Sequence, residues 1–137
     1  MATILKISEA TTLALHAMIY IAAHPEHPVS TATLAKRFKA SAAHLSKVMQ
    51  RLTHTGLLKS QRGPSGGFVL AKPAKKITLL EVYEATEGPI PDSTCLFDTP
   101  VCSGETCILS HLLKLVYNET KTFLKNTTID KQAPMFK

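Results

Sequence analysis

Residues 30–70 contain the pattern that most constrains the fold: two short helical segments, a tight break between them, and then a glycine-rich hairpin. Ser30 is a good N-cap for a helix through TATLAKRFK, and Ser41 caps a second helix through AAHLSKVMQRLTHT. Gly56 ends that second helix. The second helix has an apolar stripe with helical spacing, formed by Leu45, Val48, Met49 and Leu52.

The hairpin follows directly. Two apolar runs at 57–58 and 68–70 flank the sequence RGPSGG, which predicts two strands joined by a glycine-rich tip. RGPSGG lacks the terminal Gly-Lys-Ser/Thr of a phosphate-binding loop, so it is not a nucleotide site. An apolar helix through LALHAMIYIAAH, capped by Ser8 or Thr11, precedes the pattern and should be buried between two layers. The order predicts a mainly α fold with a small β-hairpin wing, a winged helix-turn-helix.

Charge is divided sharply along the chain, although the net charge is only +6. The segment 30–76 contains no Asp or Glu, whereas 77–113 contains acids and no Lys or Arg. The basic residues of the first segment are Lys36, Arg37, Lys39, Lys47, Arg51, Lys59, Arg62, Lys72, Lys75 and Lys76. A basic block without acids is typical of proteins that bind a polyanion, here double-stranded DNA.

The DNA contacts are expected on the helix-turn-helix and the wing. Hydroxyl groups at helix starts suit phosphates, while polar and basic residues opposite the apolar stripe suit bases in the major groove. The predicted DNA-binding residues are Ser30, Thr31, Ser41, His44, Ser46, Lys47, Arg51, Arg62, Gly66 and Gly67. Nothing in the chain has the spacing of a catalytic Ser/His/Asp or Cys/His set, so we do not expect an enzyme.

The rest of the chain divides into three regions after a winged-helix domain at 1–87. Thr78 caps a helix through LLEVYEATE, the segment 88–106 is a long loop, and a helix from about Cys107 occupies 107–126. The tail 127–137 should be a short cap followed by disorder. No run of 18 apolar residues and no signal-like start occur, so we expect no membrane partner and a cytoplasmic location.

All three cysteines, Cys95, Cys102 and Cys107, lie in or beside the long loop. Their spacing, C-x6-C-x4-C, is not that of a zinc ribbon, but three thiolates can hold one soft metal centre. Three thiols are one short of a tetrahedral set. His111 follows Cys107 by about one helical turn and is a candidate fourth ligand, whereas His16 is by default a core histidine. Three unrelated thiols remain the alternative.

The stretches TTLALHAMIYIAAH, VSTATLAKRF and SAAHLSKVMQRLTHTGLLKSQRGPSGGFVLAKPAKKITLLEVYEATEG, followed by the three cysteines, together resemble the Rrf2 family of bacterial transcription regulators. The resemblance implies a homodimer held by the long C-terminal helix. It also implies a palindromic operator, with the helix at 42–55 in the major groove and Arg62 in the minor groove.

In cluster-binding members of that family the loop cysteines ligate a [2Fe–2S] or [4Fe–4S] cluster, and these positions match Cys95, Cys102 and Cys107. The resemblance places the fourth ligand at a histidine near His111, or on the first helix of the partner at the positions of Thr12 or His16.

The sequence therefore predicts a dimeric winged-helix repressor that senses iron–sulfur status, nitric oxide or redox state through a labile cluster. One alternative keeps the fold and the DNA but uses zinc or a thiol switch. A second alternative is an iron–sulfur assembly or electron-transfer protein that does not act on DNA.

Overall fold

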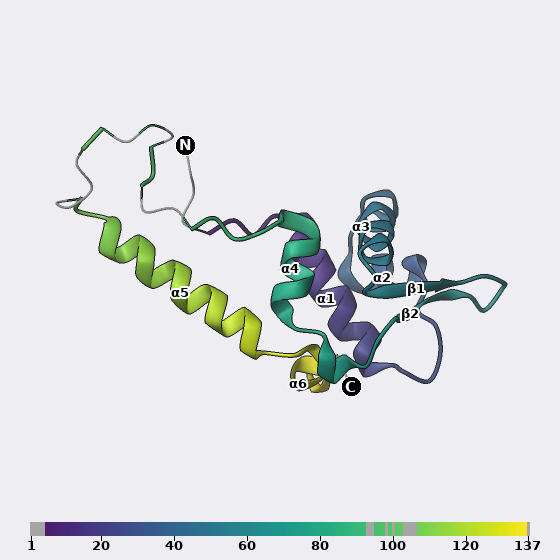
Figure 1. The fold of residues 1–137 in the computed structure, drawn as a ribbon. Helices are drawn as coiled ribbons and strands as arrows, with labels where there is room; N and C mark the ends of the chain where they lie inside the picture. The colour runs from purple at the N-terminus through teal and green to yellow at the C-terminus, as the bar shows by residue number, and fades with distance from the viewer. Residues whose placement is uncertain (1–4, 93–94, 98, 100, 103–106, 137) are drawn as a thin grey trace.

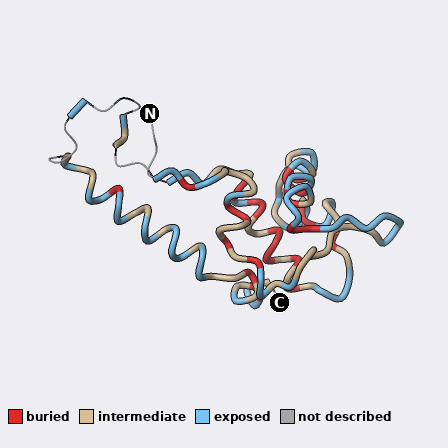
Figure 2. Tube along the Cα trace, viewed as in Figure 1, coloured by how far each residue is buried: buried red, intermediate tan, exposed pale blue. Residues whose placement is uncertain are grey.

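Helix α1 (Glu9–Ala23) lies at the centre of the fold (Figure 1). The computed structural model describes residues 5–92, 95–97, 99, 101–102 and 107–136. Ser8 caps α1, since its side chain accepts a hydrogen bond from the Thr11 amide. The helix contacts α3, α4, β2 and the C-terminal segment. Figure 2 shows its buried residues in red, which confirms that an apolar helix is buried between layers.

The helix-turn-helix consists of α2 (Thr31–Phe38) and α3 (Ala42–His54). Ser30 and Ser41 are N-caps as predicted: their hydroxyl oxygens accept from Thr33 N at 3.1 Å and His44 N at 3.3 Å. The break between the helices is made at Lys39, which adopts a left-handed conformation with φ 53°. The predicted apolar stripe of α3 is buried in the main core.

The wing is an antiparallel hairpin of β1 (Leu58–Gln61) and β2 (Gly67–Leu70). Leu58 pairs with Leu70 and Gln61 with Gly67, so residues 62–66 form the tip. Val29 exchanges two backbone hydrogen bonds with Phe68, at 3.0 and 2.8 Å, and so attaches β2 to the segment before α2. The mainly α, winged helix-turn-helix prediction is therefore confirmed.

After a short 3₁₀ turn, η1 (Ala74–Lys76), helix α4 (Leu79–Glu87) begins at its cap Thr78 and ends at Gly88, which has φ +80°. The cysteine-bearing segment then leads to α5 (Ser110–Asn126), which extends as a long arm beside the body (Figure 1). In the described part of the chain no helix combines the length and apolarity that crossing a bilayer requires.

Two predictions about the C-terminal part were wrong. The last long helix begins at Ser110, so Cys107 precedes it and is not helical. The tail is ordered rather than disordered: α6 (Ile129–Gln132) and the 3₁₀ helix η2 (Ala133–Phe136) pack on α1. The reason is long-range pairing, because Ile129 N donates to Ile77 O at 3.0 Å and the Ile129 side chain is fully buried.

Candidate DNA-binding face and cysteine pocket

The basic residues of the 30–76 block lie on the surface. All of them are exposed except Lys72, which is half buried and pairs with Glu81, Nζ to Oε1, at 3.0 Å. Among the described residues, no other lysine or arginine of this block forms an ion pair with an acid. Their charge is therefore largely uncompensated within the described protein and remains available to a polyanion.

The outer face of α3 holds the predicted base-reading residues in two different situations. Lys47 is exposed and makes no hydrogen bond or ion pair to any described residue, and Ser46 is half buried. His44 Nδ1 instead lies 3.8 Å from Glu9 Oε1, and Arg51 Nη1 donates to the carbonyl oxygen of Thr86 at 3.0 Å. His44 thus contacts the start of α1, and Arg51 contacts the end of α4.

The hydroxyl groups predicted to contact phosphate lie at two helix N-termini. Ser30 and Thr31 begin α2, and Ser41 is the N-cap of α3. Ser30 Oγ also lies 2.9 Å from Thr33 Oγ1. The amide groups of a helix's first turn have no partner within the helix and attract anions. Both N-termini are therefore suited to DNA phosphates.

Arg62 stands exposed at the start of the wing tip. Gly66 and Gly67 have a packing role that sequence reasoning did not find. A Cβ on Gly66 would lie 2.3 Å from Gln61 O, and one on Gly67 would lie 2.5 Å from Val29 O. Both glycines are required by close backbone approach, Gly66 within the turn of the tip and Gly67 against the segment before α2.

The three cysteines all line one pocket of about 300 Å3. Cys95 and Cys107 are half buried and Cys102 is exposed. The other lining residues are apolar: Leu96, Phe97, Ile108 and Leu109. Among the described residues, no three His, Cys, Asp or Glu side chains are placed together to hold a single metal ion. The three thiols nevertheless line one hollow whose other lining residues are apolar.

The two histidines predicted as a fourth ligand do not line that pocket. His111 is exposed near the start of α5, and the one-turn spacing from Cys107 fails because the helix begins only at Ser110. His16 is half buried, its Nδ1 is 2.7 Å from Thr12 O, and its ring packs edge-on against Phe38 and Phe136. In this chain His16 thus belongs to an aromatic cluster near the C-terminus.

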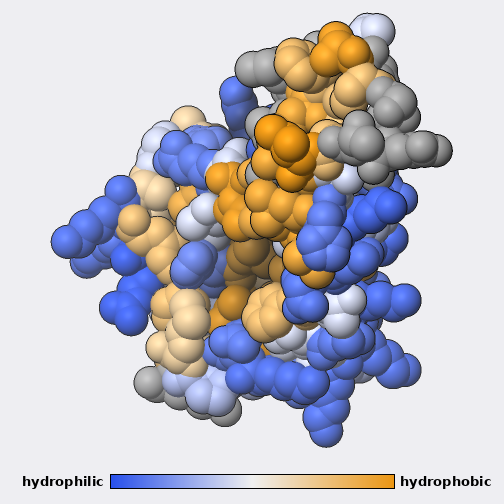
Figure 3. Space-filling view, turned by 90° about the vertical axis from the view of Figure 1, so that its left-hand side faces the viewer, coloured by the Kyte–Doolittle hydropathy of each residue, from blue (hydrophilic) through white to orange (hydrophobic). Residues whose placement is uncertain are grey.

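Helix α5 has two apolar faces. Leu113 is buried and Leu124 packs against the core, whereas Leu112, Leu115 and Phe123 are 45%, 47% and 60% exposed. The exposed three share one side, since steps of three and eleven residues return to nearly the same side of a helix with about 3.6 residues per turn. Figure 3 shows the hydrophobic surface that extends from the cysteine region down this face.

A hollow of about 420 Å3 continues this apolar surface. It lies between α5 and the segment that precedes α1, and its lining includes Leu5, Ile7 and Phe123, all of them exposed. Exposed apolar surface of this extent is typical of an interaction site. Within one chain, Leu112, Leu115 and Phe123 thus leave one apolar side of α5 exposed.

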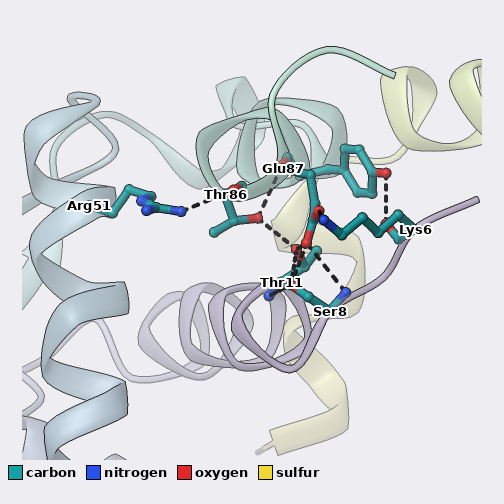
Figure 4. A network of polar contacts seen from close by, with 7 residues as sticks. Lys6, Ser8, Thr11, Arg51, Thr86 and Glu87 are labelled. Carbon is teal, nitrogen blue, oxygen red and sulfur yellow. Dashed lines mark hydrogen bonds and ion pairs between the residues drawn. The ribbon is translucent and has the colours of Figure 1, made fainter. Parts of the chain in front are cut away.

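A polar network centred on Glu87 was not predicted (Figure 4). Glu87 Oε1 accepts hydrogen bonds from Thr11 Oγ1 at 2.6 Å, from Ser8 N at 3.3 Å and from Ser8 Oγ. Lys6 Nζ lies 3.7 Å from Oε2. The bonds from Ser8 and Thr11 hold the pKa of the Glu87 carboxyl below its ordinary value. The only sequence sign of this network was a serine cap and a terminal glutamate, too common a pair to be diagnostic.

Comparison with known proteins places this geometry among transcription regulators. Residues 7–133 match the Rrf2 family, described as iron-dependent transcriptional regulators. The chain is 31% identical over 119 residues to the HTH-type transcriptional regulator IscR of Pectobacterium carotovorum, which covers 86% of this chain and 73% of IscR.

Two solved structures have the same fold. CymR, the global cysteine regulator of B. subtilis, superposes with a TM-score of 0.80 at 30% identity, covering 96% of this chain and 98% of CymR. IscR of T. potens superposes with a TM-score of 0.73 at 26% identity, covering 96% of this chain and 88% of that chain.

Proposed function

Because the chain belongs to the Rrf2 family of transcriptional regulators, we propose that it is a homodimeric repressor that senses iron–sulfur status, nitric oxide or redox state through its three cysteines. The family match favours regulation of DNA over the iron–sulfur assembly or electron-transfer alternative. The family and the relative that the chain matches are transcriptional regulators.

The observation that carries the sensing proposal is the pocket shared by Cys95, Cys102 and Cys107. Thiolates are the ligands that iron–sulfur clusters prefer, so this donor set fits a [2Fe–2S] or [4Fe–4S] cluster. A cluster held by Cys95, Cys102 and Cys107 would supply a chemically labile link between the loop and the residues just before α5. We propose His111, close in sequence to Cys107, or His16 of the partner subunit as the fourth ligand, although neither histidine lines the pocket within one chain.

The DNA-binding proposal rests on the uncompensated basic surface around α2, α3 and the wing. Lys47 projects from α3 without a described partner, and Arg62 stands at the wing tip. In a winged helix-turn-helix, α3 enters the major groove, and the wing reaches the neighbouring backbone or minor groove. A two-fold dimer would read a palindromic operator.

The dimer proposal rests on the uncovered apolar side of α5. Leu112, Leu115 and Phe123 form a self-complementary stripe that a second copy can cover. Two recognition helices bind successive major grooves only when they lie about 34–36 Å apart. Because α5 follows the cysteine segment directly, a change in how the three thiols are held can alter this separation. The sensor then shifts the balance between DNA-competent and incompetent dimers.

The test is oxygen-free purification followed by native mass spectrometry and visible absorption. The wild type should be a coloured dimer whose extra mass contains iron and sulfide. Cys102→Ser should be colourless and still dimeric, because a ligand is lost but α5 is unchanged. Thr99→Ala, an exposed change in the same segment, is the matched control and should keep the colour. A Cys102→Ser protein with an intact spectrum would remove Cys102 from the ligand set.

A second candidate function is a cluster-free thiol sensor of the same fold. It is favoured by the similarity to CymR, a global cysteine regulator. In that case the purified wild type would contain no iron, and oxidation of its thiols alone would change its DNA affinity. Metal content and absorption of the same sample therefore distinguish the two candidates.

A further inference from the structure

The C-terminus of α4 is clamped to the N-terminus of α1. The carboxylate of Glu87 takes hydrogen bonds from the backbone and side chain of Ser8 and from the hydroxyl of Thr11. Thr11 is fully buried, and its Oγ1 lies 2.8 Å from Thr86 Oγ1. Tyr83 OH also donates to Lys6 O at 2.7 Å. These contacts fix the last turn of α4 at the point where the cysteine segment begins.

The recognition helix is joined to the same turn by one side chain. Arg51 of α3 donates from Nη1 to Thr86 O at 3.0 Å (Figure 4). The last carbonyl groups of a helix lack partners within it, and the negative end of the helix dipole favours a cation there. Arg51 therefore acts as a C-terminal cap of α4 that is supplied by a different helix.

A small cleft lies where these elements meet. It has a volume of about 160 Å3, and its lining includes His44, Lys47 and Arg51 from α3 together with Ala10 and Thr86. An anion entering this cleft would compete with Thr86 O for the guanidinium of Arg51. Bonds from a guanidinium to phosphate are stronger than its bond to a neutral carbonyl, so a DNA phosphate in this cleft is a second acceptor that competes with the end of α4 for Arg51.

The cysteine segment is directly adjacent to this contact. Gly88, with φ +80°, follows α4, and the segment with the thiols begins beyond it. Thr86 and Glu87 form the last turn of α4 before Gly88, so a change in the path of the segment acts on α4 through the peptide groups of this turn. We propose that Arg51 is a positioning residue, whose bond to Thr86 transmits the state of the cysteine segment to the recognition helix. This inference rests on the proposed function, in which the cysteines sense and α3 reads DNA.

Amide hydrogen exchange of α3 tests the link without DNA and without a metal. Alkylation of the three cysteines with iodoacetamide adds polar amide groups to a hollow whose other lining is apolar, which disfavours the present path of the segment. In the wild type, alkylation should speed exchange in the second half of α3 by about two- to tenfold, the factor expected for loss of one hydrogen bond. In Arg51→Met, alkylated and unmodified protein should exchange alike.

Two further variants separate transmission from simple bracing. Arg51→Lys keeps a cationic donor and should restore part of the response to alkylation. If Arg51 had a purely structural role, its substitution would change only the exchange rate of the unmodified protein. Lys47→Met, on the same helix face but without a described partner, should respond like the wild type. The inference would be overturned if alkylation left the amide exchange of wild-type α3 unchanged. It would also be overturned if Arg51→Met responded to alkylation as strongly as the wild type.

Failure of the proposed function would look different. Binding of a random-sequence DNA duplex by the unmodified wild type, titrated with salt, should weaken steeply as salt rises. Absence of that binding contradicts the regulator function but leaves the exchange result intact. An unresponsive α3 in a protein that binds DNA contradicts only the role of Arg51.

Discussion

The winged-helix half and the α5 arm differ in what they leave exposed. In the first half, the apolar stripe of α3 is buried against α1, and the surface carries cations without described acidic partners. In the arm only Leu113 is buried, while apolar residues of α5 and the cysteine region face outward, including Ile108 at 92% exposure. The winged-helix half, together with the C-terminal segment that packs on α1, buries its apolar side chains, whereas α5 has an apolar side that no described residue covers.

This difference indicates two kinds of partner. Uncompensated positive charge on a well-packed scaffold suits a polyanion, which needs no further burial of apolar surface. Exposed leucine and phenylalanine side chains suit a protein surface, because removing them from water supplies the driving force for association. Substitutions in the two regions should therefore affect different properties. Those in the winged-helix half should weaken DNA binding, and those on α5 should weaken dimerisation.

The largest effect is expected on the arm. Leu115→Glu would place a carboxylate in the proposed dimer interface twice, once from each subunit, and burying an unpaired charge costs several kcal/mol. The dimer dissociation constant should rise by about 100-fold or more, equivalent to roughly 3 kcal/mol. Sedimentation equilibrium measures it. Lys114→Glu, also exposed on α5 but on another side, is the control, and an unchanged dimer in Leu115→Glu would exclude this face.

A smaller effect is expected on the winged-helix half. Arg62→Ala should weaken binding by about 1–3 kcal/mol, the range for a good base contact, on a duplex that the wild type has selected from a random pool. The dimer should be unaffected, since the wing lies outside the arm. Lys75→Ala, an exposed basic residue beyond the wing, should change affinity less. If both variants lost the same DNA affinity at fixed salt, Arg62 would make only a general phosphate contact and no base contact.

The smallest effect concerns the junction of the two halves and depends on pH. The hydrogen bonds of Glu87 lower its pKa in the folded protein from the ordinary value of 4.5. Its contribution to the free energy of unfolding is therefore complete above that value and is lost as the pH falls through the lowered pKa. The groups facing it are the Lys6 ammonium and Tyr83, whose own pKa is raised by burial and then by Glu87.

Denaturant unfolding from about pH 7 down to about pH 3 measures this contribution. The stability difference between wild type and Glu87→Gln should be largest near neutral pH and should shrink in acid. Glu84→Gln, one turn earlier and exposed, should show little difference at any pH. A constant difference for Glu87→Gln would mean that its carboxylate charge is not what stabilises the junction.

Local patterns predicted the winged-helix half well because its elements depend on nearby residues. Ser30, Ser41 and Thr78 cap the helices that they were expected to cap. The glycine-rich tip also lies between the two predicted strands. Side-chain caps and turn residues act within about three positions along the chain, so their effects are readable without a fold.

The same reasoning failed where distant segments meet. The tail was expected to be disordered, yet Ile129 pairs with Ile77 and is buried. The start of α5 was placed near Cys107, which made His111 look one turn away. The roles of Thr11 and Arg51 depend on the end of α4, which no spacing in the sequence places beside them.

The sequence by itself determined the order of elements, the basic block and the gathering of three thiols in one segment, because each is a local or compositional property. The tertiary structure decided which polar groups meet. It brought Glu87 to Ser8 and Thr11, and it gave Arg51 the carbonyl of Thr86 as a partner. It also decided that one side of α5 stays uncovered. Hydrogen bonding and burial depend on neighbours in space, and the order of residues along the chain does not specify those neighbours.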